Sequence, residues 1–156
     1  MLKQLARLSV EADGRYATAN ELQFLKDYLQ SLDQRVSAYE KIQANVAEII
    51  SKVEEEIRAT DPNLFRKGAR DMTATCKRDR EHVLRYSAAV LLSNDLDRLR
   101  EGLLLWYQTI VRSFQDERAS GVTYKVMQEV VKQYLTPQEA ALLEPILTLN
   151  QIVLGK

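Results

Sequence analysis

A single stripe of apolar residues runs through about forty residues of this chain, from roughly residue 19 to residue 60, mostly at steps of three and four. Residues with this spacing lie on one face of an α-helix, so the stripe predicts a long helical stretch with one buried side. Helices of globular proteins are usually shorter, and we therefore expect a break between Ser37 and Asn45. The stripe consists of Leu22, Leu25, Leu29, Leu32, Val36, Tyr39, Ile42, Val46, Ile49, Ile50, Val53 and Ile57.

Glycine and proline are scarce, with five and three residues in a chain of 156, and they fall between further periodic segments. This distribution predicts an all-α protein with a single domain over residues 1–156. Thr18–Glu21 and Thr136–Glu139 have the Thr-x-x-Glu sequence of a capping box, which marks a helix start. We expect a helix break at Ser120–Gly121. The expected helices cover about residues 2–12, 19–60, 70–92, 96–118, 122–134 and 137–154, the last of them strained at Pro145.

Charge balance and apolar runs limit the partners of the chain. The 22 lysines and arginines equal the 22 aspartates and glutamates, so net charge gives no bulk attraction to nucleic acid or anionic lipid. The longest apolar run, Leu103–Tyr107, has five residues, whereas a membrane-spanning helix needs about 20. The N-terminus lacks an apolar secretion signal, and there is one cysteine. We expect a cytoplasmic protein without disulfides, membrane insertion or a nucleic-acid partner.

The only cysteine opens the tetrapeptide Cys76-Lys77-Arg78-Asp79, near the start of the helix expected over 70–92. Residues three apart share one helix face, so the Cys76 thiol and the Asp79 carboxylate project together, with the Arg78 guanidinium beside them. Such a group can hold a ligand that carries a thiol-reactive carbon, NH groups and carboxylates. The neighbouring cations favour a lowered thiol pKa.

Three stretches of the sequence carry a resemblance to one known family. They are Ala12-Asp13-Gly14-Arg15-Tyr16 with Glu21-Leu22, Cys76-Lys77-Arg78-Asp79, and Leu84-Arg85-Tyr86 with Ala89-Val90-Leu91-Leu92 and Asp95. In these stretches the chain resembles a phycobiliprotein subunit of the allophycocyanin and phycocyanin type, best between residues 10 and 107. The resemblance implies a globin-like helical bundle with an N-terminal extension of two helices, which pack against a partner subunit.

The resemblance implies a role for each matching residue near the cysteine. Cys76 would form a thioether to an open-chain tetrapyrrole of the phycocyanobilin type. Asp79 would accept hydrogen bonds from its central pyrrole NH groups, and Arg78 would pair with a propionate. Two interpretations of His82 stay open: a pocket-lining donor to a bilin carbonyl, or a solvated residue on the helix surface.

The resemblance also implies assembly and a place of action. Asp13, Tyr16 and Arg85 resemble residues through which two subunits pair. We therefore expect a homo- or hetero-oligomer with another phycobiliprotein-like subunit, and contacts with photosynthetic complexes. The implied function is an accessory role in light harvesting or energy transfer at the cytoplasmic face of the thylakoid membrane. No paired catalytic carboxylates, nucleophile with a base, or phosphate loop is present, so no enzyme activity is expected.

The chain departs from the family pattern beside the cysteine. The segment Asp61–Thr75 has fifteen residues and one glycine, Gly68. The family usually has a longer glycine-rich loop that wraps the pigment, so we expect a shallower or more open pocket. His82 and Val83 stand where the family often has aromatic residues. Two alternatives stay open: a pigment-free relative that acts as an assembly or regulatory interaction module, and a sensor that binds another hydrophobic ligand without a covalent bond.

Simpler interpretations of the same residues stay open as well. A lone cysteine in a helical protein is usually a small buried hydrophobic residue. The run Arg78-Asp79-Arg80-Glu81 also fits the charged outer face of a helix. Trp106 and Tyr107 lie in the apolar stripe of the helix expected over 96–118, and we predict that they pack in the core. Because the chain has one histidine, metal binding is not expected.

Overall fold

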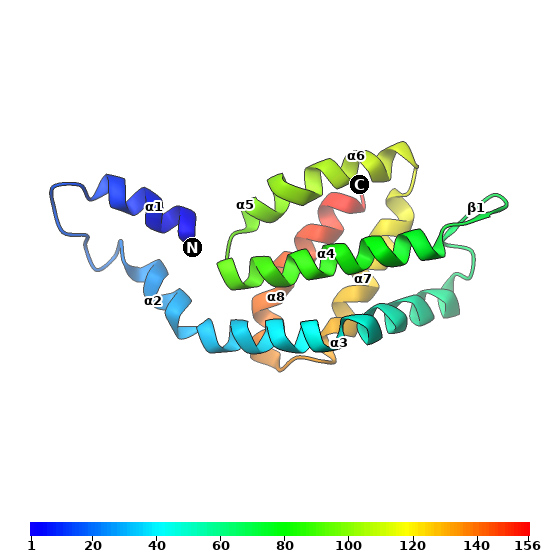
Figure 1. Ribbon diagram of the computed structural model, residues 1–156, viewed down its shortest axis with the longest axis horizontal. Helices are drawn as coiled ribbons and strands as arrows, with labels where there is room; N and C mark the ends of the chain where they lie inside the picture. The colour runs from blue at the N-terminus through cyan, green and yellow to red at the C-terminus, as the bar shows by residue number, and fades with distance from the viewer.

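The computed structural model describes residues 1–156 as a chain of helices with one short β-hairpin. Figure 1 shows most helices side by side, with two helices projecting at one end and the hairpin at the other. The predicted all-α class is therefore confirmed. The elements are α1 (Leu2–Glu11), α2 (Gln23–Gln30), α3 (Leu32–Thr60), β1 (Arg66–Lys67), β2 (Arg70–Asp71), α4 (Thr73–Ser93), α5 (Leu96–Leu99), the π-helical turn η1 (Arg100–Leu104), α6 (Leu105–Ser113), α7 (Glu117–Lys132) and α8 (Pro137–Leu154).

The long apolar stripe forms α3, and the break in the chain lies before this helix rather than within it. α3 runs for 29 residues from Leu32 to Thr60 without interruption, so the break expected between Ser37 and Asn45 is wrong. The chain bends instead at Ser31, between α2 and α3.

Arg35 and Tyr28 explain where this bend lies. The Arg35 guanidinium is buried and donates to the carbonyl oxygen of Leu91 at 2.8 Å, while the Tyr28 hydroxyl donates to that of Leu92 at 2.5 Å. Both carbonyls belong to the end of α4, where a helix has no backbone donors of its own left to satisfy them. Arg35 also donates to the Ser31 hydroxyl at 2.9 Å. The end of α4 thus holds α2 and α3 on either side of the bend.

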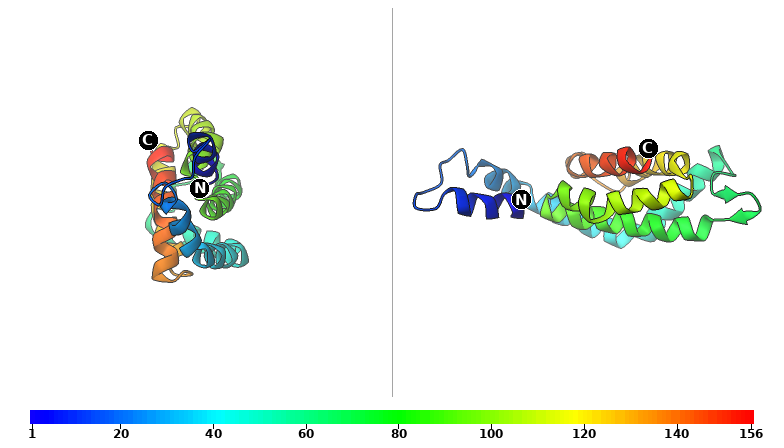
Figure 2. Two further views of the ribbon diagram at one scale, coloured as in Figure 1. Left: turned by 90° about the vertical axis from the view of Figure 1, so that its left-hand side faces the viewer. Right: turned by 90° about the horizontal axis from the view of Figure 1, so that it is seen from above.

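α1 and α2 form a two-helix extension that projects from the bundle, as the right-hand view of Figure 2 shows. Leu8 is the buried residue of α1, and α2 has none. The capping box of Thr18 and Glu21 forms, with backbone-to-side-chain bonds of 2.8 and 3.2 Å, but a turn follows it and α2 starts only at Gln23. The extension exposes large apolar side chains, namely those of Leu2, Leu5, Val10, Tyr16 and Leu29.

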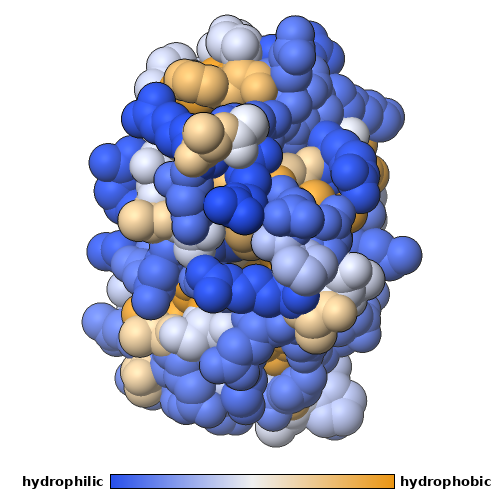
Figure 3. Space-filling model, turned by 90° about the vertical axis from the view of Figure 1, so that its right-hand side faces the viewer, coloured by the Kyte–Doolittle hydropathy of each residue, from blue (hydrophilic) through white to orange (hydrophobic).

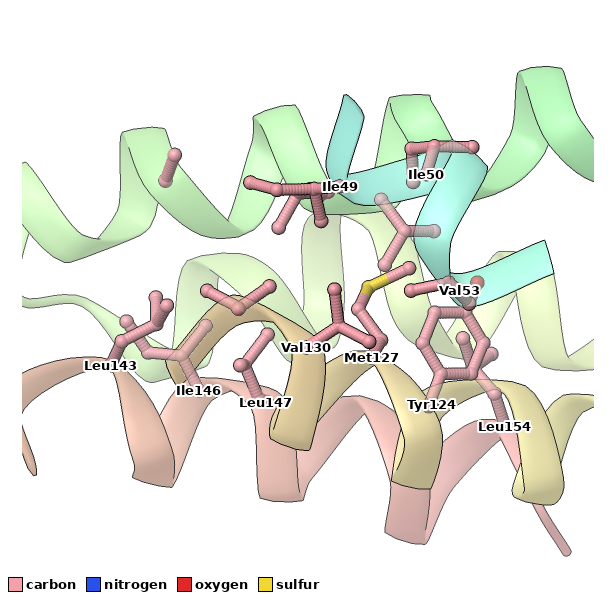
Figure 4. Packing of buried hydrophobic residues seen from close by; sticks show 14 of the residues in the cluster. Ile49, Ile50, Val53, Tyr124, Met127, Val130, Leu143, Ile146, Leu147 and Leu154 are labelled. Atoms are coloured by element: carbon pink, nitrogen blue, oxygen red, sulfur yellow. The ribbon is translucent and has the colours of Figure 1, made fainter. Parts of the chain in front are cut away.

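One continuous hydrophobic core lies between α3, α4, α7 and α8. Figure 4 shows side chains of α3 facing those of α7 and α8 across this core. The C-terminal part of the predicted α3 stripe is confirmed, since Ile42, Ile49, Ile50, Val53 and Ile57 are buried. Leu29 and Val36, toward the other end of the stripe, are exposed.

The break in the second half of the chain lies at Phe114–Asp116, where Gln115 takes a φ of 53°. The break expected at Ser120–Gly121 is wrong, since both residues lie inside α7. Gly121 instead faces the end of α8, and a Cβ placed on it would lie 3.4 Å from the Cα of Gly155. The absence of a side chain at Gly121 therefore allows α7 to approach the end of α8 closely.

A hairpin precedes α4, and a capping box precedes α8. The segment between α3 and α4 contains the β1–β2 hairpin, with Arg66 opposite Asp71 and Gly68 at a φ of 59°, so α4 starts at Thr73 and not at about residue 70. The capping box predicted at Thr136 and Glu139 forms and begins α8, which continues through Pro145. None of the helices combines the length and apolar character that a membrane crossing requires.

Candidate functional site

A cavity of about 530 Å³ opens where the hairpin meets the N-terminal half of α4, and α6 and α7 form its opposite walls. The hairpin connects to the turn between α6 and α7 through Lys67, whose ammonium group lies 2.8 Å from the Asp116 carboxylate and donates to the Gln115 carbonyl at 2.9 Å. Figure 3 views the molecule from this end, where hydrophilic side chains cover most of the face and apolar residues are visible between them.

The four binding residues predicted from the sequence, Cys76, Arg78, Asp79 and His82, all line this one cavity. Cys76 and Asp79 are half-buried, whereas His82 is exposed. The Arg78 side chain is 77% exposed and donates to Asp79 through Nε and Nη2, both at 3.2 Å. Arg78 thus lines the cavity and also belongs to the solvated face of α4, so both interpretations of this residue describe part of its position.

The Cys76 thiol does not have the lowered pKa that its cationic neighbours suggested. Burial raises its pKa, and the carboxylates of Asp116 and Asp79 act in the same direction. Arg80 and Lys67 oppose the shift, but less strongly than burial supports it. The thiol is therefore mainly protonated at neutral pH, and its reactions require removal of the proton.

Aromatic side chains that sequence reasoning did not assign to the site form much of the cavity wall. Trp106 is 62% exposed and lines the cavity, so its predicted place in the core is wrong. Tyr107 is half-buried, lines the cavity beside it and stacks on it with ring centroids 6.4 Å apart. Further aromatic rings of the wall belong to Phe65, Phe114 and Tyr124.

The π-helical turn η1 explains the error at Trp106. Such a turn closes i→i+5 hydrogen bonds and so contains one more residue than an α-helical turn. Residues after η1 are therefore rotated away from the face that Leu99 presents to the core. The available signal was the run Leu103–Tyr107, whose five consecutive apolar residues cover more than one side of a helix.

Arg80 and Tyr124 lie at the inner end of the cavity and are almost fully buried. Burial raises the pKa of Tyr124, and the adjacent Tyr107 adds to this shift. Burial and then the Asp79 carboxylate raise the pKa of Tyr107. Both phenols thus stay protonated and can donate hydrogen bonds.

The three residues predicted for subunit pairing lie in two separate parts of the chain. Asp13 and Tyr16 lie exposed in the connection between α1 and α2, and Tyr16 is 98% exposed. Arg85 lies on α4, where its guanidinium contacts Glu81 at 3.0 Å. Their pairing role stays a prediction.

Comparison with known proteins gives the context of this cavity. The family model described as "Phycobilisome protein" matches residues 8–151. The chain belongs to the phycobilisome protein family. The phycobiliprotein beta chain of Mastigocladus laminosus is 32% identical over 127 residues, which make up 78% of this chain and 75% of the relative. The allophycocyanin subunit beta-18 of Aglaothamnion neglectum is 26% identical over 136 residues, or 84% of this chain and 80% of the relative.

Membership of the phycobilisome protein family confirms the predicted globin-like fold, and the match extends through α7 into α8. Proteins of this family serve light harvesting, bind open-chain tetrapyrroles and form oligomers of alpha and beta subunits.

The residues present in the cavity fit an open-chain tetrapyrrole. The cavity volume of about 530 Å³ lies in the range of roughly 300–1,000 Å³ that is common for ligand pockets. The wall offers aromatic faces for a conjugated ligand, a carboxylate for NH groups and a thiol for covalent attachment. Four cations line it for acidic side chains, namely Lys67, Arg70, Arg78 and Arg80. The segment before α4, although shorter than the usual loop of the family, therefore forms one wall of the cavity.

Proposed function

We propose that this protein carries an open-chain tetrapyrrole of the phycocyanobilin type, attached at Cys76, and takes an accessory part in light harvesting or energy transfer. The observation that carries this proposal is the convergence of Cys76, Asp79 and three arginines on one aromatic cavity in a protein of this family. We place its action at the cytoplasmic face of the thylakoid membrane, together with other photosynthetic proteins.

Each residue has a distinct task in this proposal. Cys76 would hold the tetrapyrrole through a thioether, formed by addition of its S–H group across an exocyclic carbon–carbon double bond, with the sulfur on one carbon and the thiol proton on its neighbour, so that no oxidant or reductant is needed. The Asp79 carboxylate accepts hydrogen bonds from pyrrole NH groups, and Arg78 covers the solvent side. When bound, the tetrapyrrole supplies the absorption of visible light. Trp106 and Tyr107, which line the cavity, would offer their aromatic faces to its conjugated system.

Replacement of Cys76 tests the attachment. The protein is produced together with bilin-synthesis enzymes and candidate lyases, and its visible absorbance and intact mass are measured. We expect an intense red band and a bilin mass adduct, both lost in Cys76→Ala because no other thiol is present. Thr60→Ala, on an exposed residue at the end of α3, is the control and keeps both signals. An unchanged adduct in Cys76→Ala would refute covalent attachment there.

A pigment-free interaction module is the second candidate function. It is favoured by the exposed apolar side chains of the α1–α2 extension, which need no pigment in order to bind a partner. Colourless protein of unmodified mass, purified from its native source, would favour this function over the first.

Both functions require association through the extension, and a single substitution tests it. Val10 is 74% exposed on α1, so Val10→Glu places a charge on the proposed contact without entering the core. We expect a shift toward monomer in light scattering, with the same result after deletion of residues 1–17. Ile152→Glu, at a 48% exposed apolar position of α8, is the matched control. An unchanged molar mass for both variants of the extension would contradict this role.

A further inference from the structure

Arg80 is the most buried arginine of the chain, yet its guanidinium has no hydrogen-bond acceptor. The residue is 2% exposed, and Nε, Nη1 and Nη2 all lack a partner. Its guanidinium carbon lies 4.5 Å from the centre of the Phe65 ring, a cation–π contact that satisfies none of its N–H groups. Burial lowers its pKa, but an arginine stays charged in a protein.

The nearest carboxylate does not neutralise this charge. Nη2 of Arg80 lies 3.7 Å from Oε2 of Glu54, beyond hydrogen-bond distance. The same Glu54 is already paired with Arg58 on the next turn of α3, where the contact is 2.6 Å. Two cations thus share one carboxylate, and Arg80 has the weaker contact. Buried charges in proteins are normally paired and hydrogen-bonded, because the loss of water is otherwise uncompensated.

The position of Arg80 indicates what its partner is. The residue lines the inner end of the cavity together with Cys76, Tyr107 and Tyr124. Arg80 therefore borders the cavity, while its guanidinium nitrogens are closed off from solvent. The five N–H donors of a guanidinium form a planar fork that matches the two oxygens of a carboxylate.

We propose that Arg80 is the inner anion receptor of the cavity and binds one carboxylate of the ligand beside Cys76. This inference rests on the proposed function and deepens it, since it assigns the ligand's orientation: one acidic side chain points inward to Arg80, and the other lies at the solvent side. Arg78 is the weaker receptor because it is exposed and already pairs with Asp79. The Phe65 ring lies against the guanidinium.

The experiment compares an open-chain tetrapyrrole with its dimethyl ester, whose carboxylates are blocked. Binding to the bilin-free protein is measured by fluorescence quenching in a Cys76→Ala background, so that no attachment occurs. We expect the free acid to bind about tenfold or more tightly than the ester, and Arg80→Met to abolish most of this preference. Arg80→Lys keeps the positive charge but loses the planar pair of N–H donors, so it should retain part of the preference for the free acid. Arg112→Met, on an exposed arginine outside the cavity, is the control.

Thermal unfolding of the bilin-free protein gives a second readout. If the main role of Arg80 is ligand binding, Arg80→Met keeps or raises the Tm, since an unpaired buried charge is removed. A lowered Tm with an undiminished preference for the free acid would overturn the proposal and show a structural ion pair with Glu54. Equal binding of acid and ester to the protein with Arg80 would also overturn it, while the proposed function stands. Failure of both ligands to bind would overturn both.

Discussion

Acidification from pH 5 to pH 2 is expected to remove about 3 kcal/mol of stability from this protein through one carboxylate, Glu139. Glu139 is 3% exposed and accepts from Lys41 at 2.8 and 2.7 Å, from the Ser37 hydroxyl at 2.6 Å and from the Thr136 backbone at 2.8 Å. Burial opposes its ionisation, but these donors outweigh burial and lower its pKa from 4.5 to about 2. A carboxylate whose pKa is lower in the folded protein than in the unfolded chain stabilises the folded state at pH values above the unfolded pKa. This stabilisation is lost as the pH falls through the folded pKa.

Urea unfolding at pH 7 and pH 2.5 tests this expectation. Glu139→Gln should lower the free energy of unfolding at pH 7 by about 2–3 kcal/mol and should differ less from the unsubstituted protein at pH 2.5. Glu129→Gln, at an exposed carboxylate of α7, should change little at either pH. The pKa of Glu21 is also about 2, owing mainly to Arg15, but Glu21 is common to all variants and so drops out of the comparison. An equal loss at both pH values would contradict the assignment to Glu139.

Asp79→Asn is expected to have the largest effect on the colour of the loaded protein. A carboxylate beside the NH groups of a tetrapyrrole favours its protonated, cationic form, and an amide of the same shape does not. Removal of an opposite charge at 4–6 Å typically shifts a pKa by about 1–3 units. The pKa of the bound pigment should therefore fall by that amount, and the red band should be lost at a correspondingly lower pH.

Absorbance recorded from pH 4 to pH 10 measures this shift. The matched control is Glu81→Gln, since Glu81 lies on the same helix, is also half-buried, and pairs with Arg85 outside the cavity. We expect its titration to follow that of the unsubstituted protein. If the two variants shift the titration equally, the effect comes from the charge of α4 as a whole, and Asp79 has no special contact with the pigment.

Sequence patterns correctly predicted the parts of the fold that depend on contacts between residues close together in the sequence. The C-terminal part of the α3 stripe and the capping box of α8 follow from spacing within a few residues, and both were correct. The bend at Ser31 depends on Arg35 and Tyr28 reaching the end of α4, which lies about sixty residues away in sequence. No pattern within α2 or α3 reports such a contact.

The site shows the same division between local and distant contacts. Cys76, Arg78 and Asp79 are neighbours in sequence, and one helical turn was enough to group them. Trp106 was misplaced because the π-helical turn η1 rotates the helix beyond it. Arg80 was read as part of a charged outer face, and only the packing of α4 against α3 shows that it is buried.

α4 carries the cavity on its N-terminal half and the anchor of the extension at its C-terminal end. From Cys76 to Leu92 the helix rises by about 1.5 Å per residue over sixteen residues, so a stiff rod of roughly 24 Å separates the cysteine from the anchor. If the proposed pigment is bound and subunits join through the extensions, the spacing of neighbouring pigments would be set by a helix and not by flexible loops. Because excitation transfer falls steeply with distance, the length of α4 would then fix the rate of transfer between the pigments of neighbouring subunits.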